Sequence, residues 1–209
     1  FLPALKNSLV FTVLYVPTNI ILSLLLAIGL GPRIRGRGAL RVLFFIPVVT
    51  PMVANVLVWK MLLQPQGLFN GVATSWFGVE LPNFLADRNW AMIMVVVMSV
   101  WQGLGYNMLI FYSSLSTIPH SLYEAASIDG ASEWQIIKSI KLPELKGSLA
   151  ITVIFSIIGS FQLFNEPSIM QNMVPGNAIS TYYTPNMYAY NLSFAGNQSN
   201  YAAALAITM

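Results

Sequence analysis

Four long apolar segments constrain the fold of this chain more than any other feature of its sequence. Each is close to or above the roughly 20 residues that an α-helix needs to cross the hydrocarbon of a bilayer, and each contains few charged residues. The segments do not alternate polar with apolar residues, as the shorter strands of a membrane β-barrel do. They comprise residues 8–30, 42–63, 90–117 and 148–170. We therefore predict an all-α fold, a polytopic transmembrane helical bundle.

The composition supports a lipid environment and narrows the functional classes. Hydrophobic residues make up 56% of the 209 residues and charged residues only 8%, whereas soluble domains carry about 25% charged residues. The net charge of +3 does not indicate a nucleic-acid partner, because membrane proteins concentrate Lys and Arg in cytoplasmic loops. Cysteine is absent and His120 is the only histidine, which excludes disulfides, thiolate or histidine-clustered metal sites and a Ser-His-Asp triad. We expect no catalytic residue, metal or cofactor.

Positive charge in the loops predicts the orientation of the segments. Loops rich in Lys and Arg face the cytoplasm, and two crossings separate the two basic loops, so one orientation satisfies both. The chain then starts outside, and its last apolar run, from Tyr201 to Met209, is too short to cross the bilayer. We expect the natural protein to continue in both directions, with a span missing at each end and six spans in total. The basic residues are Arg33, Arg35, Arg37 and Arg41 in the first cytoplasmic loop and Lys138, Lys141 and Lys146 in the second.

The two loops on the opposite side are expected to differ. Residues 64–89 contain several Pro and Gly residues typical of turns, so we predict an irregular loop in which Trp76 and Phe77 anchor at the membrane interface. Residues 171–200 hold no charge, and we predict an ordered loop that includes a short interfacial helix. Their tyrosines are interpreted as an aromatic belt in preference to a ligand cage.

The cytoplasmic loop of residues 119–146 is predicted to form two short helices. Ser121 and Glu124 fit a capping box at the start of the first helix, in which each side chain satisfies a free backbone N–H. The Asp129-Gly130 pair is a strong turn signal that ends this helix. The small residues between them, Ala125, Ala126 and Ser127, would let another surface approach the helix backbone closely.

The second helix of this loop has its own start and stop signals. Ser132 with Gln135 is a candidate cap, the helix is expected to run to about Ile140, and Pro143 is expected to end it. Ile136, Ile137 and Ile140 form an apolar stripe along it. A capped two-helix unit favours a docking element for a soluble partner, although cytoplasmic loops also contain amphipathic helices that lie on the bilayer.

The residues of this loop resemble the EAA loop of ABC-importer permeases. The resemblance rests on Glu124-Ala125-Ala126, Asp129-Gly130-Ala131 and Ile140-Lys141-Leu142-Pro143 at the family spacing. It implies the type I permease fold, lacking the first and last spans here, and a coupling helix seated in a cleft of a cytoplasmic ATPase subunit. Glu124 would be the charged contact and Gly130 would permit the sharp turn. The implied coupling residues are Glu124, Ala125, Ala126, Asp129, Gly130, Ala131, Leu142 and Pro143.

The resemblance covers nearly the whole chain and is closest to the sugar-type branch, similar to maltose or glycerol-phosphate permeases. It implies a multi-pass protein of the prokaryotic inner membrane, with cytoplasmic ATP-binding ABC subunits, a second permease subunit and an extracytoplasmic solute-binding protein as partners. It also implies import of a sugar or similar polyhydroxylated solute by alternating access. Residues 171–176 depart from the glycine-richer turn of relatives, so binding-protein docking is expected to differ in detail. The supporting residues are 7–9, 35–38, 44–47, 101–105 and 201–206.

Polar residues inside the apolar segments are candidates for a solute path. Such residues are costly in lipid unless they face a cavity or another helix, and amides can both donate and accept hydrogen bonds to hydroxyl groups. The alternative for each is packing between helices, and Glu166 also lies within reach of the outer headgroups. The candidates are Asn55, Gln102, Asn107, Gln162, Asn165 and Glu166.

Three other functional classes fit the residues less well. An ion-coupled secondary transporter predicts several intramembrane carboxylates or repeated halves, whereas Glu166 is the only acidic residue inside a predicted span. A membrane enzyme would need a nucleophile–base pair, a metal set or facing carboxylates. A purely structural subunit would not need the coupling-type loop. A P-loop glycine motif is also absent from the sequence, so any ATP hydrolysis is expected on a separate chain.

Overall fold

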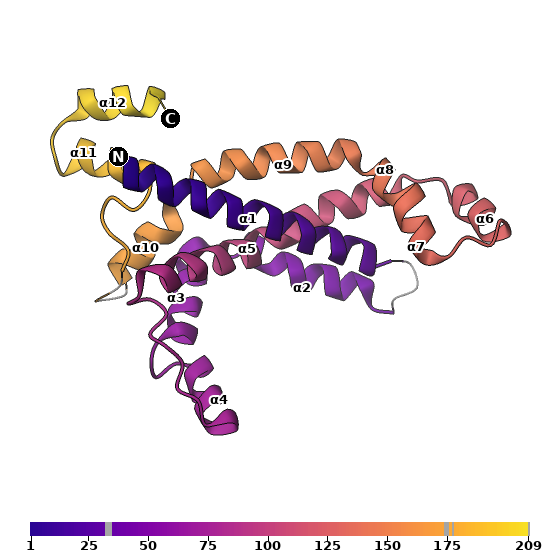
Figure 1. Cartoon of the computed structure of the whole chain (residues 1–209), viewed down its shortest axis with the longest axis horizontal. Coiled ribbons are helices and arrows are strands. Elements are labelled where there is room, and N and C mark those ends of the chain that lie inside the picture. Colours follow the sequence, from indigo (N-terminus) through magenta and orange to yellow (C-terminus); the bar gives the residue numbers. More distant parts are fainter. Residues whose placement is uncertain (32–34, 174–175, 177, 209) are drawn as a thin grey trace. The chain divides into compact units, whose positions relative to one another are not determined.

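The computed structural model describes residues 1–31, 35–173, 176 and 178–208, and the regular elements in these ranges are all helical (Figure 1). The predicted all-α class is therefore confirmed. The helices are α1 (Leu2–Gly29), α2 (Arg37–Val49), α3 (Met52–Leu63), α4 (Leu68–Phe77), α5 (Arg88–Ser116), α6 (His120–Ile128), α7 (Glu133–Ile136), the π-helix η1 (Ile137–Lys141), α8 (Leu142–Glu144), α9 (Lys146–Phe161), α10 (Asn165–Met173), α11 (Pro185–Phe194) and α12 (Ser199–Thr208).

Three of the four predicted spans correspond to helices long and apolar enough to cross a membrane. These are α1, α5 and the run of residues Lys146–Asn172 that joins α9 to α10. The second predicted span is not one continuous helix, because the chain is interrupted at Thr50 and Pro51 between α2 and α3. Pro51 has no backbone N–H to donate and disfavours helical geometry at the residue before it. The interrupted segment supplies a fourth crossing if its two parts count as one span.

Exposed and buried residues on α9 follow the pattern expected of a membrane helix that packs one face against other helices and presents the other face to lipid. Thr152, Ser156 and Ser160, spaced four residues apart, are buried, whereas Ile154 and Phe155 are more than half exposed. Small polar residues at helix contacts and large apolar residues outside are typical of membrane proteins, because lipid solvates apolar side chains and not hydroxyl groups.

The described chain divides into two compact units. The first comprises Phe1–Tyr15, Thr50–Val100 and Ile158–Met209. Within it, α10 packs against α3 and α11 against α12, and the Ala178 N–H donates to the Leu85 carbonyl at 2.8 Å. The second comprises Val16–Val49 and Trp101–Ile157. Within this second unit, α6 and α7 lie beyond the C-terminal ends of α1 and α5 (Figure 1).

The loop of residues 64–89 contains a helix that the sequence interpretation missed. Helix α4 occupies Leu68–Phe77, between Gly67 at its start and Gly78, whose φ of 64° ends it in the left-handed conformation. A Cβ at Gly67 would lie 2.5 Å from the Met61 carbonyl oxygen, so the turn before α4 requires glycine. The turn residues that suggested an irregular loop are thus the two ends of a helix.

The structure bears on two further expectations for residues 64–89 and 171–200, of which the membrane anchoring stays a prediction. Trp76 and Phe77, proposed as interface anchors, are 78% and 75% exposed at the C-terminal end of α4. The expected short helix in residues 171–200 is present as α11. The Val174-Pro175 pair, part of the segment that departs from the family pattern, lies outside the described residues, as does Arg33 of the basic loop.

Candidate functional site

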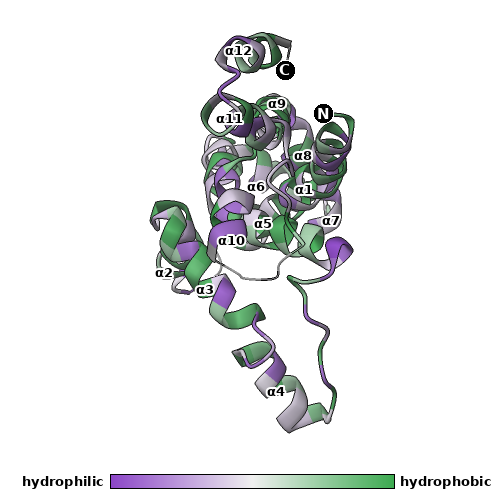
Figure 2. Cartoon of the chain, turned by 90° about the vertical axis from the view of Figure 1, so that its left-hand side faces the viewer, coloured by the Kyte–Doolittle hydropathy of each residue, from purple (hydrophilic) through white to green (hydrophobic). Residues whose placement is uncertain are grey.

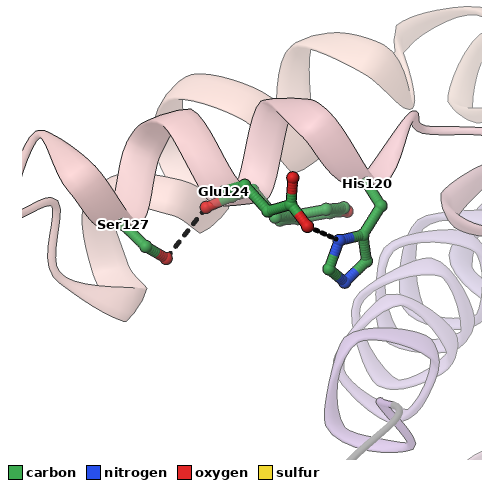
Figure 3. A network of polar contacts seen from close by, with 4 residues as sticks. His120, Glu124 and Ser127 are labelled. Atoms are coloured by element: carbon green, nitrogen blue, oxygen red, sulfur yellow. Dashed lines mark hydrogen bonds and ion pairs between the residues drawn. The ribbon is translucent and has the colours of Figure 1, made fainter.

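Helix α6 is the element that carries the coupling-type motif, and its start differs from the predicted capping box. Pro119 is the N-cap residue and provides no side-chain hydrogen bond. Ser121 therefore lies inside the helix, where its hydroxyl is not at the capping position. Glu124 instead reaches back one turn to His120, with 3.0 Å between His120 Nδ1 and Glu124 Oε1, while the Ser127 hydroxyl donates to the Tyr123 carbonyl at 2.8 Å (Figure 3).

The end of α6 forms the turn that the Asp129-Gly130 pair predicted. Gly130 has a φ of 71°, a conformation that L-residues with a side chain rarely adopt. The Gly130 N–H donates to the Ser127 carbonyl at 3.2 Å and the Ala131 N–H donates to the Ala126 carbonyl at 2.9 Å. This pair of bonds is the Schellman arrangement, which satisfies carbonyls left without partners at a helix end. The turn is therefore a defined, hydrogen-bonded corner.

The second helix of the loop begins as predicted but ends differently. The Ser132 N–H donates to Gln135 Oε1 at 2.7 Å and the Gln135 N–H donates to Ser132 Oγ at 3.4 Å, which confirms the capping box. Pro143 does not end the helix, and that prediction was wrong. The π-helix η1 widens the backbone, with the Leu142 N–H bonded to the Ile137 carbonyl five residues earlier, and so accommodates the missing N–H of Pro143. The chain continues helically through α8 to α9.

The outer face of the loop is open to solvent in this chain. Glu124, Ala125, Asp129, Gly130, Leu142 and Pro143 are exposed, and Ala126 and Ala131 are half-buried. Two large apolar residues flank the corner, Ile128 at 86% and Trp134 at 69% exposure. The sequence interpretation did not single them out, although an apolar residue on each side of an Asp-Gly turn is a usable signal. Ile136 is buried, and Ile137 and Ile140 are half-buried on the opposite side.

Asn107, one of the solute-path candidates, is engaged in a buried contact between α5 and α1. Its amide donates to Asn19 Oδ1 at 2.7 Å, and the Ser23 hydroxyl lies 3.1 Å from both the same oxygen and the Leu104 carbonyl. Asn19 and Ser23 are fully buried and Asn107 is 5% exposed. Asn19 and Ser23 were missed, although their spacing of four residues in the first apolar segment places them on one helix face.

A close backbone contact lies near this cluster in the same unit. A Cβ at Gly105 would lie 2.1 Å from the Phe44 carbonyl oxygen, so α5 approaches α2 at a point where only glycine fits. Also between these helices, the Arg41 guanidinium lies 3.4 Å from the centroid of the Tyr112 ring, a cation–π contact.

Three other solute-path candidates, Gln162, Asn165 and Glu166, lie together where the chain breaks between α9 and α10. Gln162 and Asn165 are exposed and Glu166 is half-buried. The hydroxyl of Thr184 donates to the Leu163 carbonyl at 2.8 Å and the amide of Asn186 donates to the Phe161 carbonyl at 3.0 Å. The start of α11 thus satisfies carbonyls that the break exposes. Figure 2 shows the helix that follows, α10, as hydrophilic.

The remaining candidates occupy separate positions. Asn55 is 1% exposed in α3, with its amide 3.4 Å from the Thr50 carbonyl at the interruption before that helix. Gln102 is half-buried in α5, and its Oε1 has no hydrogen-bond partner among the described residues. Groups of three or more residues able to hold a metal ion were not found within the described ranges.

The comparisons with known proteins agree on one family. Residues 9–209 match the binding-protein-dependent transport system inner membrane component family. The chain is 35% identical to the lactose transport system permease protein LacF of Rhizobium radiobacter, over 98% of this chain and 70% of that protein. It is 33% identical to the trehalose/maltose transport system permease protein MalF of Thermococcus litoralis, over 89% of this chain and 63% of that protein.

A solved structure shares the fold. It is a bacterial ABC transporter involved in the import of the acidic polysaccharide alginate, with a TM-score of 0.89, 23% identity and coverage of 100% of this chain and 73% of that one. The spanning helices and the family match define a multi-pass inner-membrane transport component. The chain belongs to the binding-protein-dependent transport system inner membrane component family and is a permease component of an ABC importer.

Proposed function

We propose that this permease component moves a sugar or small oligosaccharide inward, driven by cytoplasmic ATP-binding subunits that dock on α6. The relatives that support the solute class are named for lactose, trehalose and maltose, and arabinooligosaccharides. The polar residues of the spans are consistent with an uncharged solute, since five of the six candidates carry amides. Amides can donate and accept hydrogen bonds to hydroxyl groups without requiring a charged ligand.

The geometry of residues 119–146 carries the coupling part of this proposal. The exposed face of α6 is attached to the spans on both sides: Pro119 connects it to the end of α5, and the corner at Gly130 connects it to α7. From α7 the chain stays hydrogen-bonded into α9, with the Leu145 N–H on the Lys141 carbonyl at 3.1 Å and the Leu149 N–H on the Leu145 carbonyl at 2.8 Å. A displacement of α6 by a docked subunit would therefore be transmitted to α9.

The individual roles follow from exposure. Glu124 would provide the charged contact to an ATPase subunit, with Ala125 and Ala126 permitting close approach. Asp129, Gly130 and Ala131 would keep the corner rigid, and Leu142 and Pro143 would carry motion toward α9. A second permease subunit would complete the solute path, and an extracytoplasmic binding protein would deliver the solute. We assign Gln162, Asn165 and Glu166, at one helix break, as the first residues to test for solute contact, followed by Gln102 and Asn55.

The proposal is tested with the full-length protein, assembled with its partner subunits in proteoliposomes. Uptake of lactose, maltose and arabinooligosaccharides and solute-stimulated ATP hydrolysis are measured together. Glu124→Gln is expected to lower both at an unchanged amount of permease in the membrane, whereas Glu144→Gln, on an exposed residue of the same loop, is expected to leave them unchanged. Full uptake without any ATPase subunit bound would refute the coupling role, and failure of every sugar would refute the solute class.

A further inference from the structure

Helix α4 divides its side chains into an apolar half and a polar half. Successive residues of a helix are turned by about 100°, so the residues with apolar side chains fall on one half of its circumference. Asparagine, glycine, threonine and serine fall on the other half. Such a division is typical of a helix that lies between an apolar and a polar phase. The apolar half consists of Leu68, Phe69, Val72, Ala73, Trp76 and Phe77.

The polar half of α4 is held by hydrogen bonds within its own loop. The Asn70 side chain donates to the Pro65 carbonyl at 2.6 Å and accepts from the Leu81 N–H at 2.9 Å. The hydroxyls of Thr74 and Ser75 donate to carbonyls one turn earlier, at 2.8 Å and 2.7 Å. The bond to Leu81 ties this half to the chain that runs back from α4 to α5 (Figure 1). The apolar half therefore faces away from the returning chain.

The apolar half is open along its length. Leu68, Trp76 and Phe77 are 63%, 78% and 75% exposed, and Phe69 and Val72 are also classed as exposed. A contiguous apolar surface of this kind marks a site that contacts a protein or a membrane.

The lack of charge in this part of the chain favours lipid over a soluble protein. Residues 61–79 contain no Asp, Glu, Lys or Arg. The contact surface for a soluble partner has a polar rim around its apolar centre, whereas here the apolar half extends to the helix end. Trp, Phe and Leu are the residues with which amphipathic helices enter the boundary between headgroups and acyl chains.

The apolar half of α4 is also continuous with the preceding membrane segment. Helix α3 belongs to the interrupted apolar segment that is long enough to supply a fourth crossing. Val58 and Met61 of α3 are exposed, as expected of side chains that contact lipid in a multi-pass membrane protein. The Trp59 ring of α3 makes an edge contact with the Phe69 ring of α4, with 6.5 Å between the centroids. The lipid-facing surface of α3 thus continues onto α4.

We propose that α4 docks on the lipid bilayer as a helix lying in the membrane plane, with its apolar half in the acyl chains and its polar half toward water. The leaflet is the one on the side opposite the basic loops. The proposal extends the anchoring expected of Trp76 and Phe77 to a whole helix, and it makes residues 64–89 a membrane-docked arm. Docking on lipid does not depend on the proposed function.

Spin labels on the two halves of α4 test the proposal. The complete transporter, free of cysteine except at the introduced position, is reconstituted in nanodiscs of phosphatidylethanolamine and phosphatidylglycerol. Oxygen, which concentrates in lipid, and a water-soluble nickel chelate then compete to relax the label. A label on Val72→Cys is expected to respond more to oxygen. A label on Thr74→Cys, an exposed position on the opposite half, is expected to respond more to the chelate.

The other environments give different results in the same experiment. A Val72→Cys label relaxed mainly by the nickel chelate would place the apolar half in water and overturn the proposal. A label relaxed by neither reagent would show that a protein covers α4, either the second permease chain or the solute-binding protein, and would overturn it as well. A Thr74→Cys label that responds mainly to oxygen would overturn the position of α4 at the interface.

A charge on the apolar half tests whether that half holds the helix in lipid. Trp76→Glu, combined with the Val72→Cys label, is expected to reverse the preference from oxygen to the chelate, because a carboxylate is costly in hydrocarbon. Thr74→Glu is the matched control, since it adds the same charge to the polar half and should leave the Val72→Cys label in lipid. An unchanged preference in Trp76→Glu would overturn anchoring by the apolar half.

Failure of this proposal is distinguishable from failure of the proposed function. Glu124 lies in the second unit and α4 in the first. Glu124→Gln is expected to lower solute-stimulated ATP hydrolysis and to leave the Val72→Cys label in lipid. A label in water together with the expected loss of ATP hydrolysis would refute lipid docking alone, and a label in lipid together with unchanged ATP hydrolysis would refute the coupling role alone.

Discussion

Polar side chains in the loop of residues 119–146 bond to groups a few residues away, whereas several in the spans, besides such local bonds, also bond across helices. His120 contacts Glu124 and Ser132 contacts Gln135, and all four are exposed. By contrast, Asn107 contacts Asn19 on another helix, and Thr12 Oγ1 lies 2.8 Å from Ser160 Oγ. The reason is the solvent: water completes the hydrogen bonding of loop residues, and lipid cannot.

This contrast indicates where function and where stability reside. A loop whose helices are held by their own caps leaves its outer face available for a partner. Asn107 and Asn19 are buried and bonded to each other, so we expect such pairs in the spans to hold helices together and not to contact a solute. Variants in the loop should therefore alter transport without unfolding the protein, and variants of the buried pairs should do the reverse.

Gly130→Pro is the change with the largest expected effect. Proline fixes φ near −65°, whereas Gly130 has a φ of 71°, so the corner cannot form and uptake should fall to background with normal membrane insertion. Uptake assays and membrane fractionation measure the two outcomes. Gly130→Asn is the control, because asparagine tolerates the left-handed conformation. Normal uptake by Gly130→Pro would break the link between the corner and coupling.

Gly105→Ala should have the next largest effect, on stability. Its Cβ would lie 2.1 Å from the Phe44 carbonyl oxygen, which forces the backbones apart at a cost of about 1–3 kcal/mol. Thermal unfolding in detergent should show the loss, with Gly147→Ala as the control in open space. An unchanged unfolding temperature would mean that α5 and α2 are not in contact there.

Asn107→Ala should destabilise the protein by about 1–2 kcal/mol, because it leaves Asn19 without one of its buried partners. A double-mutant cycle with Asn19→Ala should give a coupling of about 0.6 kcal/mol, the mean for such pairs in membranes. Denaturation and uptake are measured on the same preparations. Normal stability with lost uptake would show that Asn107 contacts the solute and does not hold α5 against α1. It would contradict the assignment of buried polar pairs to stability.

Ser132→Ala should have the smallest effect. It removes the cap of α7 and should cost about 0.5–1 kcal/mol locally. Faster hydrogen exchange in residues 133–137, with slightly reduced uptake and an unchanged unfolding temperature, is the expected signature. Ser139→Ala, on an exposed residue of η1, should change none of the three. A lowered unfolding temperature would show that the loop contributes to global stability.

Local signals in the sequence predicted the helix start and the corner correctly where a single residue type determines the backbone conformation or its hydrogen bonds. Gly130 predicted a left-handed turn, and Ser132 with Gln135 predicted a cap. They failed where two signals competed. Pro143 is a strong stop signal, but a π-turn accommodates it. The glycines of residues 64–89 suggested an irregular loop, but Gly67 and Gly78 are the residues at which α4 begins and ends.

The sequence by itself determined the membrane environment, the helical class and the coupling-type loop. Hydropathy, helix periodicity and turn propensity depend on residues that are close together in the chain, so they can be read directly from the sequence. Only the tertiary structure decided that Asn107 pairs with Asn19, that Gly105 touches the backbone at Phe44, and that Thr12 lies beside Ser160. These features join segments far apart in the chain, and their geometry depends on how side chains of different helices pack, which no local pattern specifies.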